Sequence, residues 1–351
     1  MIQLEKLAEF DGHPFVARIT DPGTGLRGFI AIHDTTLGPA VGGTRYYPYR
    51  SEEEALKDAL RLSRAMTYKC AVAGVPYGGG KAVLVAPKGA GTKKSEAYLA
   101  AYARRLKFLN GNFYTGEDVG MIERDIEVLA SHSNAIVGRP AVGGLPAQFA
   151  ALSVFRALET ALQEETGSAS LLRKTVAIKG LGNVGMDLAG LLHDAGASLV
   201  AADVDEARVR EAKKKFPDIR IVSPARIHRE AVDIYAPCAL GGEFTPSTVR
   251  QLGAKIVCGA ANNQLANDKM GAALAKRGVL YIPDYVANAG GLISVVDELN
   301  VAGYSEARVR ERIGNMRSTV SRIIRDAKAK KLPTSVVADE LVREKLRSHN
   351  A

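Results

Sequence analysis

Two lysines and an aspartate near the start of the chain stand in settings that suit acid–base chemistry. Lys69 ends the segment MTYK, Lys81 directly follows three glycines, and Asp118 lies within GEDVG. Glycines allow close approach of the backbone, so we expect Lys81 to occupy a confined place. Burial disfavours the charged ammonium and lowers the pKa of a lysine, which would let Lys81 act as a general base near neutral pH. Each residue taken alone is also compatible with an ordinary surface charge.

A second group of residues, GLGNVG at 180–185, has the spacing of a phosphate-binding turn. The β-rich run TVAIK precedes it, a helical pattern begins within it, and Asp203 ends the next strand 21 residues after Gly182. In this pattern Gly180 allows a tight turn and Gly182 lets the backbone approach a pyrophosphate. Gly185 lets the helix pack close to the sheet.

The helix of this motif begins at Asn183 and Val184, whose position predicts contacts with a cofactor. Free N–H groups and the positive end of the helix dipole attract phosphates there. Asp203 would accept hydrogen bonds from the 2′- and 3′-hydroxyls of a ribose and would repel a 2′-phosphate. The pattern therefore predicts NAD rather than NADP. A glycine-rich strand–helix turn without a ligand is the alternative.

The elements that must hold the lysines follow from apolar patterns. An apolar run at 28–32 predicts a buried strand, and Ser51 with Glu54 resembles a capping box at the start of a helix. Lys81 is followed by Ala-Val-Leu-Val, which predicts a second strand. The segment around Lys81 is therefore expected to be extended and buried.

The later part of the chain predicts a parallel sheet with helices on its faces. Strands and helices alternate there, at 175–179, 184–195, 198–203 and 206–215. A Gly- and Pro-rich segment at 138–146 indicates a domain boundary. We therefore predict an α/β protein with a substrate-binding and catalytic domain at 1–140 and a Rossmann-type domain at 141–324. The last helices, about 325–351, could return to the first domain.

The composition is that of a globular protein with room for two cores. The chain has 351 residues, of which 46% are hydrophobic and 24% charged. It has no run of 18 apolar residues and no signal-peptide pattern, so we expect neither a membrane helix nor secretion. Cys70, Cys238 and Cys258 are too widely spaced for a disulfide framework or a zinc site. Reduced thiols in the cytoplasm and no metal are predicted.

The net charge of +9 raises the question of a nucleic-acid partner. Segment 306–350 holds most of the excess, with twelve Lys or Arg against six Asp or Glu. Its apolar residues recur at spacings of three and four, at Ile313, Met316, Val320, Ile323 and Ala327. The segment therefore predicts an amphipathic helix with a solvated basic face, and no nucleic-acid partner is expected.

Seven stretches of the chain resemble the leucine, phenylalanine and valine dehydrogenases, a group related to glutamate dehydrogenase. They are TLGPAVGGTR (36–45), MTYKCAVAGVPYGGGKAV (66–83), GEDVG (116–120), GLGNVG (180–185), DIYAPCALG (233–241), GAANNQL (259–265) and PDYVANAGGLI (283–293). They span nearly the whole chain in the family's order, and several are long. The resemblance is therefore specific.

The resemblance implies roles for residues of the first domain. Lys69 would bind the α-carboxylate of the substrate, and the backbone at Gly42 and Gly43 would line the same pocket. Lys81 would activate water and polarise the carbonyl. Asp118 would take a proton from the substrate ammonium and later pass protons on.

The resemblance also implies roles for residues of the second domain. Asn262 would help to hold the substrate carboxylate near the nicotinamide ribose, and Asn288 lies in the loop that closes on the nicotinamide side. Ala239 would be a further cofactor contact. Leu292 and Val295 would line the side-chain pocket. A capping or turn role is the alternative for the two asparagines, and a place in an ordinary helix core is the alternative for the last two residues.

The reaction implied by the resemblance is reversible, NAD-dependent oxidative deamination of an apolar L-amino acid of the phenylalanine or leucine type. The amine loses a proton, hydride leaves Cα for the nicotinamide, and water activated by Lys81 attacks the iminium. Ammonia leaves and a 2-oxo acid remains. The family further implies a cleft between the two domains and a homo-oligomer.

The sequence departs from the family pattern at Ala150, in the run PAQFAA, where relatives have a threonine that contacts the nicotinamide amide. This loss leaves cofactor orientation open. Gly116 and Leu292 follow the phenylalanine-type pattern, and Gly116 is interpreted as removing a methyl group from the pocket wall. One methylene changes selectivity by only about 1–3 kcal/mol, so leucine remains an alternative substrate.

Two other interpretations stay open at this point. Some relatives form carbon–carbon bonds on amino-acid-derived substrates, and Ala150 is compatible with such a change of chemistry. A non-catalytic NAD-binding sensor is the second alternative. The joint presence of Lys69, Lys81 and Asp118 argues against a sensor, because a binding module needs none of them.

Overall fold

The computed structural model describes residues 3–89, 91 and 93–349, and the chain divides into two compact units. Unit 1 comprises Met1–Leu145, Ser294–Glu306 and Glu344–Ala351, and unit 2 comprises Pro146–Ile293 and Ala307–Arg343. The two-domain α/β organisation is as predicted, but the boundaries differ. Residues 294–306 join unit 1, where the Glu298 carboxylate accepts hydrogen bonds from the backbone N–H groups of Gly138 and Arg139 at 3.1 and 3.2 Å. Among the described residues of the last helices, only 344–349 return to unit 1.

Unit 1 is built on a mixed six-stranded sheet. In spatial order its strands are β1 (Phe15–Asp21), β2 (Leu26–Asp34), β5 (Gly78–Val85), β3 (Ala40–Val41) and β6 (Phe113–Tyr114), and β4 (Thr44–Tyr47) also pairs with β5. Strand β2 runs antiparallel to both β1 and β5, whereas β3 and β4 run parallel to β5. The predicted strand at 28–32 lies in β2, and the run after Lys81 continues β5.

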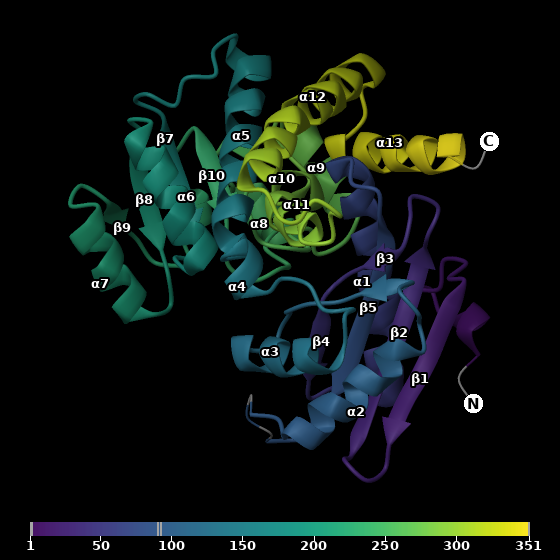
Figure 1. Cartoon of the computed structure of the whole chain (residues 1–351). Helices are drawn as coiled ribbons and strands as arrows, with labels where there is room; N and C mark the ends of the chain where they lie inside the picture. Colours follow the sequence, from purple (N-terminus) through teal and green to yellow (C-terminus); the bar gives the residue numbers. More distant parts are fainter. Residues whose placement is uncertain (1–2, 90, 92, 350–351) are drawn as a thin grey trace. The chain divides into compact units, whose positions relative to one another are not determined.

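Helices cover both faces of this sheet because side chains alternate along its strands. Phe29 of β2 packs in one apolar cluster with Leu60 of α1, and Ile30 packs in another with Tyr102 of α2. The Ser51 hydroxyl caps the first turn of α1, as predicted. Figure 1 shows these elements in purple to blue. The helices are α1 (Glu52–Ala73), α2 (Glu96–Lys107), α3 (Glu123–His132) and α4 (Pro140–Gly143), preceded by the 3-10 turn η1 (Leu4–Lys6).

Unit 2 contains an all-parallel six-stranded sheet. Its spatial order is β12 (Leu280–Tyr281), β11 (Ile256–Val257), β10 (Ile234–Pro237), β7 (Thr175–Lys179), β8 (Ser198–Ala202) and β9 (Arg220–Ile221). The order runs outward in both directions from the β7–β10 pair, as in a doubly wound sheet. Ligands of such sheets bind beyond the carboxyl ends of the strands at this switch point.

The helices of unit 2 alternate with its strands, and Figure 1 shows α6 beside β7 and β8 and α7 beside β9. They are α5 (Pro146–Thr166), α6 (Asn183–Asp194), α7 (Glu206–Lys215), η2 (Ile227–Arg229), α8 (Pro246–Gln251), α9 (Lys269–Lys276), α10 (Asp284–Ala287), α11 (Gly290–Asp297), α12 (Glu306–Lys330) and α13 (Thr334–His349). Unit boundaries fall within α11 and α13 and at the start of α12. Within the described ranges, no helix combines the length and apolarity needed to cross a membrane.

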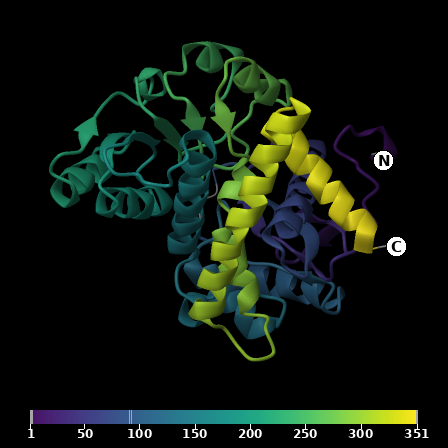
Figure 2. The same cartoon turned by 90° about the horizontal axis from the view of Figure 1, so that it is seen from above.

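The basic helix α12 is amphipathic, as predicted, and lies alongside α5 (Figure 2). All five apolar residues singled out in its sequence are buried. Its basic side pairs with acidic residues of α5: Arg317 lies 2.5 Å from Glu159, and Arg325 lies 2.9 Å from Glu164. Much of the excess positive charge in this segment is therefore compensated within unit 2.

Candidate active site

Lys81 lies in the centre of unit 1, on a strand whose residues are all buried. Each of the three preceding glycines permits a close approach that a side chain would block. A Cβ would lie 1.9 Å from the carbonyl of Asp34 at Gly78, 2.1 Å from the backbone nitrogen of Thr67 at Gly79, and 2.7 Å from the Phe113 ring at Gly80. Lys81 is 6% exposed. The expectation of a confined lysine is confirmed.

The ammonium of Lys81 lies 2.9 Å from Oδ2 of Asp118, so the structure brings these two predicted site residues together. The carboxylate offsets the cost of burying the positive charge. Burial by itself would raise the pKa of Asp118, but the charges of Lys81 and Arg45 outweigh it and hold that pKa below its usual value. Asp118 is therefore an ionised carboxylate at neutral pH, while the general-base role of Lys81 stays a prediction.

The segment that carries Asp118 is fixed against β4 by backbone hydrogen bonds. The N–H of Thr44 donates to the carbonyl of Gly116 at 2.9 Å, and the N–H of Tyr46 donates to that of Val119 at 2.8 Å. A Cβ on Gly43 would lie 2.9 Å from Cβ of Asp118. Glycine at position 43 is therefore what lets β4 and the Asp118 segment lie so close.

Two other predicted glycines owe their identity to backbone packing. A Cβ on Gly42 would lie 1.9 Å from the carbonyl oxygen of Gly80, next to Lys81. A Cβ on Gly116 would lie 2.5 Å from the carbonyl oxygen of Val137. The interpretation that Gly116 removes a methyl group from a pocket wall is wrong, because that methyl group would point into neighbouring backbone.

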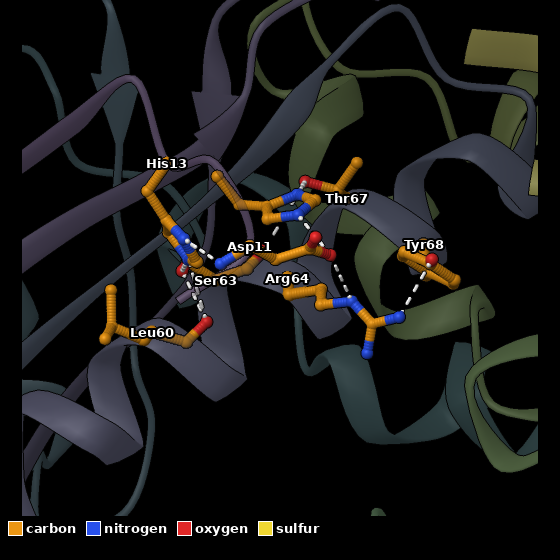
Figure 3. A network of polar contacts seen from close by, with 8 residues as sticks. Asp11, His13, Leu60, Ser63, Arg64, Thr67 and Tyr68 are labelled. Carbon is orange, nitrogen blue, oxygen red and sulfur yellow. Dashed lines mark hydrogen bonds and ion pairs between the residues drawn. The ribbon is translucent and has the colours of Figure 1, made fainter. Parts of the chain in front are cut away.

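Lys69 lies on α1, close in sequence to a polar network that holds this helix (Figure 3). Arg64 lies 2.8 Å from the carboxylate of Asp11 and donates to the hydroxyl of Tyr68 at 3.0 Å. A ring nitrogen of His33 lies 2.9 Å from the hydroxyl of Thr67. Helix α1 also approaches β5 closely at Thr67, so the helix carrying Lys69 packs on the strand carrying Lys81.

Sequence reasoning missed Arg45, although it lies in one of the stretches that carry the family resemblance. Its Nε lies 2.9 Å from Oδ2 of Asp118, and its Nη1 lies 2.9 Å from Oδ2 of Asp58. Arg45 stands between the buried Thr44 and Tyr46 on β4, so strand alternation predicts an outward, solvated side chain. No local signal indicated its two carboxylate partners, which come from other parts of the chain.

The glycine-rich turn of unit 2 has the conformation that its sequence predicts. Gly180 has a φ of +100°, and its N–H donates to the carbonyl of Ala202 at 2.8 Å. A Cβ there would lie 2.8 Å from the backbone nitrogen of Ala239, and a Cβ on Gly185 would lie 2.0 Å from the carbonyl of Gly180. The turn therefore packs tightly against the end of β10 and against its own helix.

Gly182 differs from the other two glycines because it faces nearly open space. Among the described residues, only the guanidinium of Arg208 lies within 4 Å of a Cβ placed there, at 3.5 Å. Asn183 and Val184, the first residues of α6, follow directly. An open glycine beside a helix N-terminus fits the approach of a pyrophosphate. The local geometry thus suits a dinucleotide.

Asp203 follows β8 and is tied to the same turn. Its carboxylate accepts hydrogen bonds from the N–H groups of Leu181 at 2.5 Å and Asp205 at 2.8 Å. A carboxylate has about four acceptor positions, so two remain for the hydroxyls of a ribose. Arg208 lies 3.9 Å from this carboxylate, a positive charge that the sequence pattern did not indicate.

Two exposed apolar residues flank the glycine-rich turn and were missed in the sequence. Val204 follows Asp203 beyond β8 and is 89% exposed, and Leu240 follows Ala239 beyond β10 and is 87% exposed. Strand β7, which leads into the turn, lies between β8 and β10. Exposed apolar side chains at the carboxyl ends of these strands suit contact with the flat faces of a base. Their position directly after predicted site residues was the available signal.

Asn262 and Asn288 lie together in unit 2. Nδ2 of Asn288 donates to Oδ1 of Asn262 and to the carbonyl of Ala260, both at 2.9 Å. Asn288 is 4% exposed, and its Oδ1 is a buried acceptor without a partner among residues of the described ranges. A buried unsatisfied acceptor is costly, so this atom suits a donor from a ligand such as an amide or a hydroxyl.

Leu292 and Val295, the residues predicted to line the side-chain pocket, lie in different units. Leu292 is buried in unit 2, whereas Val295 lies in unit 1 with its methyl groups beside Gly138, so their pocket role stays a prediction. Ala150 lies on α5, beside Gly291. The nearby hydroxyl of Ser153 donates to the carbonyl of Ala150 at 2.9 Å and accepts the N–H of Gly290 at 3.0 Å.

Comparisons with known proteins agree with this geometry. Residues 16–135 match the Glu/Leu/Phe/Val dehydrogenase dimerisation domain, and residues 203–348 match the Glutamate/Leucine/Phenylalanine/Valine dehydrogenase family. The chain is 41% identical to leucine dehydrogenase from Geobacillus stearothermophilus, over 98% of this chain and 94% of that protein. It is 42% identical to L-tryptophan dehydrogenase from Nostoc punctiforme, over 99% of this chain and 96% of that protein.

A solved structure extends the likeness to the fold. The crystal structure of L-tryptophan dehydrogenase from Nostoc punctiforme matches with a TM-score of 0.84 and 41% identity, over 97% of both chains. Matches of this length and identity join both units to one group of amino-acid dehydrogenases. The chain therefore belongs to the Glu/Leu/Phe/Val dehydrogenase family.

Proposed function

We propose that the protein catalyses the reversible, NAD-dependent oxidative deamination of an apolar L-amino acid to the 2-oxo acid and ammonia. The observation that carries this proposal is the buried Lys81, paired at 2.9 Å with an ionised Asp118 in a chain of this family. Relatives named for leucine, tryptophan and phenylalanine support an apolar substrate. The match of residues 16–135 to a dimerisation domain supports a homo-oligomer. We further propose that the protein acts in the cytoplasm.

Residues of unit 1 would bind and activate the amino acid. Lys69 pairs with its α-carboxylate, beside the backbone of Gly42 and Gly43. Asp118 accepts a proton from the substrate ammonium, since its carboxylate is ionised at neutral pH. Lys81, once neutral, takes a proton from the water that attacks the iminium carbon, and its ammonium form stabilises the oxygen that develops there.

Residues of unit 2 would hold the nicotinamide cofactor. The cofactor supplies the acceptor for the hydride that leaves Cα. The open turn at Gly182 and the first N–H groups of α6 bind its pyrophosphate, and Asp203 accepts its ribose hydroxyls. Val204 and Leu240 contact its base. Asn288 presents its unpartnered Oδ1 to a donor on the nicotinamide side, with Asn262 held next to it.

The choice between NAD and NADP rests on two opposite charges. The Asp203 carboxylate would repel a 2′-phosphate, which favours NAD. The guanidinium of Arg208, 3.9 Å away, would attract one but is half-exposed, so its effect is screened by solvent. We propose NAD as the main cofactor.

The side-chain preference is proposed to cover both branched and aromatic amino acids. Gly116 does not favour an aromatic substrate, because a Cβ placed there would face the carbonyl of Val137. Named relatives at 41–42% identity include leucine, tryptophan and phenylalanine dehydrogenases. An apolar pocket separates such substrates by only about 1–3 kcal/mol per methylene.

The test is formation of NADH from NAD and a panel of L-amino acids at alkaline pH, with the wild type and Lys81→Ala. We expect turnover of L-Leu, L-Phe or L-Trp, and a loss of kcat of about 10²–10⁴-fold in the variant, as for removal of a general base. The matched control is Lys57→Ala, which removes an exposed lysine paired with Glu53 on the surface of α1. No NADH from any amino acid, or equal losses in the two variants, would contradict the proposal.

A further inference from the structure

We infer that Arg45 is a positioning residue that orients Asp118 and keeps it ionised while Lys81 changes its protonation state. The inference rests on the proposed function of the Lys81–Asp118 pair. The guanidinium of Arg45 lies between the carboxylates of Asp118 and Asp58. Its side chain is 20% exposed, and those of Asp118 and Asp58 are 22% and 12% exposed. Burial of this degree limits screening of the charges by solvent.

Two cations share one oxygen of Asp118. Nε of Arg45 and Nζ of Lys81 each lie 2.9 Å from Oδ2. Within the described part of the chain, Oδ1 has neither a hydrogen bond nor an ion pair. Two contacts from different strands restrain rotation of the carboxylate about its last bond. They leave Oδ1 as the oxygen that can accept a proton from a substrate ammonium.

The other end of the guanidinium is held equally firmly. Nη1 of Arg45 lies 2.9 Å from Oδ2 of Asp58, which also accepts a hydrogen bond from the Tyr49 hydroxyl at 2.6 Å. The second oxygen of Asp58 pairs with Arg61 at 2.7 Å. The planar fork of an arginine can bridge two carboxylates in this way, whereas a lysine offers one point charge. Arg45 therefore connects Asp118 on its loop to Asp58 on α1.

The charges around Asp118 explain why a second cation is useful. Lys81 faces it from β5 and Arg45 from β4, whereas Glu117 adjoins it in sequence and Asp58 lies beyond Arg45. When Lys81 becomes neutral in order to activate water, Asp118 loses one of its two cations. The guanidinium of Arg45 does not deprotonate in proteins. It can thus keep Asp118 ionised in both states of the lysine.

The neighbouring acids make this compensation necessary. Burial raises the pKa of Glu117, and the carboxylates of Glu123, Asp118 and Asp125 raise it further. The Asp125 carboxylate is paired with the buried ammonium of Lys94 at 2.7 Å. Without Arg45, the same crowding of negative charge would favour a proton on Asp118 whenever Lys81 is neutral.

The first measurement is the pH profile of kcat/KM for the wild type, Arg45→Gln, Arg45→Lys and the control Arg61→Gln. Arg61 pairs with Asp58 rather than with Asp118, so its variant disturbs the same cluster without touching the proposed contact. In Arg45→Gln we expect the acid limb, along which Asp118 takes up a proton, to move to higher pH by about one unit or more. Arg45→Lys should show a smaller shift, and Arg61→Gln none.

A uniform loss of activity in Arg45→Gln with an unmoved acid limb would overturn the inference, since it would mean that Arg45 only supports the fold. The same shift in Arg61→Gln would overturn it as well. If Arg45→Gln does not fold, Arg45→Lys takes its place, because it keeps the charge but loses the bridge. An unmoved acid limb with unchanged kcat in that variant would also contradict the inference.

A second measurement needs no substrate and separates this inference from the proposed function. The stability change caused by Asp118→Asn is followed against pH, once in the wild-type background and once in the Arg45→Gln background. A carboxylate with a lowered folded-state pKa stabilises the fold above its unfolded pKa, and this is lost as pH falls through the folded-state value. In both backgrounds the loss begins near the unfolded-state pKa, but we expect it to be smaller, and to be complete at a higher pH, in the Arg45→Gln background. An equal loss over the same pH range in both backgrounds would refute the inference, whereas absence of amino-acid turnover in the wild type would refute only the proposed function.

Discussion

The two candidate sites of this protein are built by opposite means. The site in unit 1 is made of charged side chains from four separate segments: Lys81 on β5, Arg45 on β4, Asp58 on α1 and Asp118 on its loop. The site in unit 2 is made largely of backbone, with the turn at 180–185 at its centre. One arrangement depends on long-range ion pairs, and the other depends on glycine.

This difference determines how each site should fail. A charged cluster loses function when a single charge is removed or titrated, because its remaining members are left buried without compensation. A glycine-rich turn carries no titratable group and should be insensitive to pH, but a single added methyl group can block it. Substitutions that distinguish these two modes of failure test the comparison directly.

The largest structural effect should come from Gly180→Ala in unit 2. A Cβ there would lie 2.8–2.9 Å from Ala239 and Cys238, at a φ of +100° that disfavours any side chain. We expect a loss of stability on the order of 3 kcal/mol, from strain and overpacking together, and a weakening of NAD binding of tenfold or more. Calorimetric titration of NAD and denaturant unfolding of the same samples measure both.

The control for this variant is Gly278→Ala in the same unit. Gly278 also has a positive φ, +71°, but no atom of the described chain lies within 4 Å of a Cβ placed there. Gly278→Ala should lower the free energy of unfolding by only about 1 kcal/mol and leave NAD binding unchanged. Equal effects of the two substitutions on NAD binding would show that close packing against the end of β10 is unimportant.

The next largest effect is a pH dependence that belongs to unit 1. Nδ1 of His13 accepts a hydrogen bond from the N–H of Asp11 at 3.2 Å, and Nε2 donates one to the carbonyl of Leu60 at 3.1 Å. A ring with one accepting and one donating nitrogen is neutral. Burial is the main cause that lowers the pKa of His13 from 6.5 to about 4. The unfolded state therefore binds a proton that the folded state rejects between these two values. Stability is fully present above pH 6.5 and is lost as pH falls toward 4, by on the order of 3 kcal/mol.

Hydrogen exchange of α1 amides at several pH values measures this effect, because α1 carries the partner Leu60. After correction for intrinsic rates, protection should fall with pH in the wild type and fall less in His13→Gln. The control is His193→Gln, because the side chain of His193 is 49% exposed and lies in unit 2. A wild-type α1 whose protection does not change between about pH 7 and pH 5 would contradict the neutral, buried state of His13.

The same contrast explains what could be predicted from the sequence. The turn at 180–185 is contiguous, and Gly180, Gly182 and Gly185 each have a fixed position in a strand–turn–helix, so spacing alone predicted the local geometry. The burial of Lys81 followed from the three glycines beside it. Arg45 was missed because its partners are 13 and 73 residues away, on α1 and on a loop that is hydrogen-bonded to β4, and only the folded chain brings them together. The role given to Gly116 was wrong because the sequence does not show which neighbour a missing Cβ would meet.

The smallest expected effect concerns a charged side chain on the open side of the glycine turn. Arg208 lies 3.5 Å from a Cβ placed on Gly182 and 3.9 Å from Asp203, and its side chain is 51% exposed. Asp203 and Arg208 act in opposite directions on a 2′-phosphate, so Arg208→Ser should lower kcat/KM for NADP about 3–5-fold and leave NAD nearly unchanged, as expected for an exposed ion pair. Asp203→Ala should instead raise kcat/KM for NADP relative to that for NAD. The ratio of kcat/KM for the two cofactors measures the effect, with Arg210→Ser as control because Arg210 pairs with Glu206 on the surface of α7. An equal loss with both cofactors in Arg208→Ser would mean that this side chain supports the turn itself, and the unit 2 site would then depend on a charge in the way that the unit 1 site does.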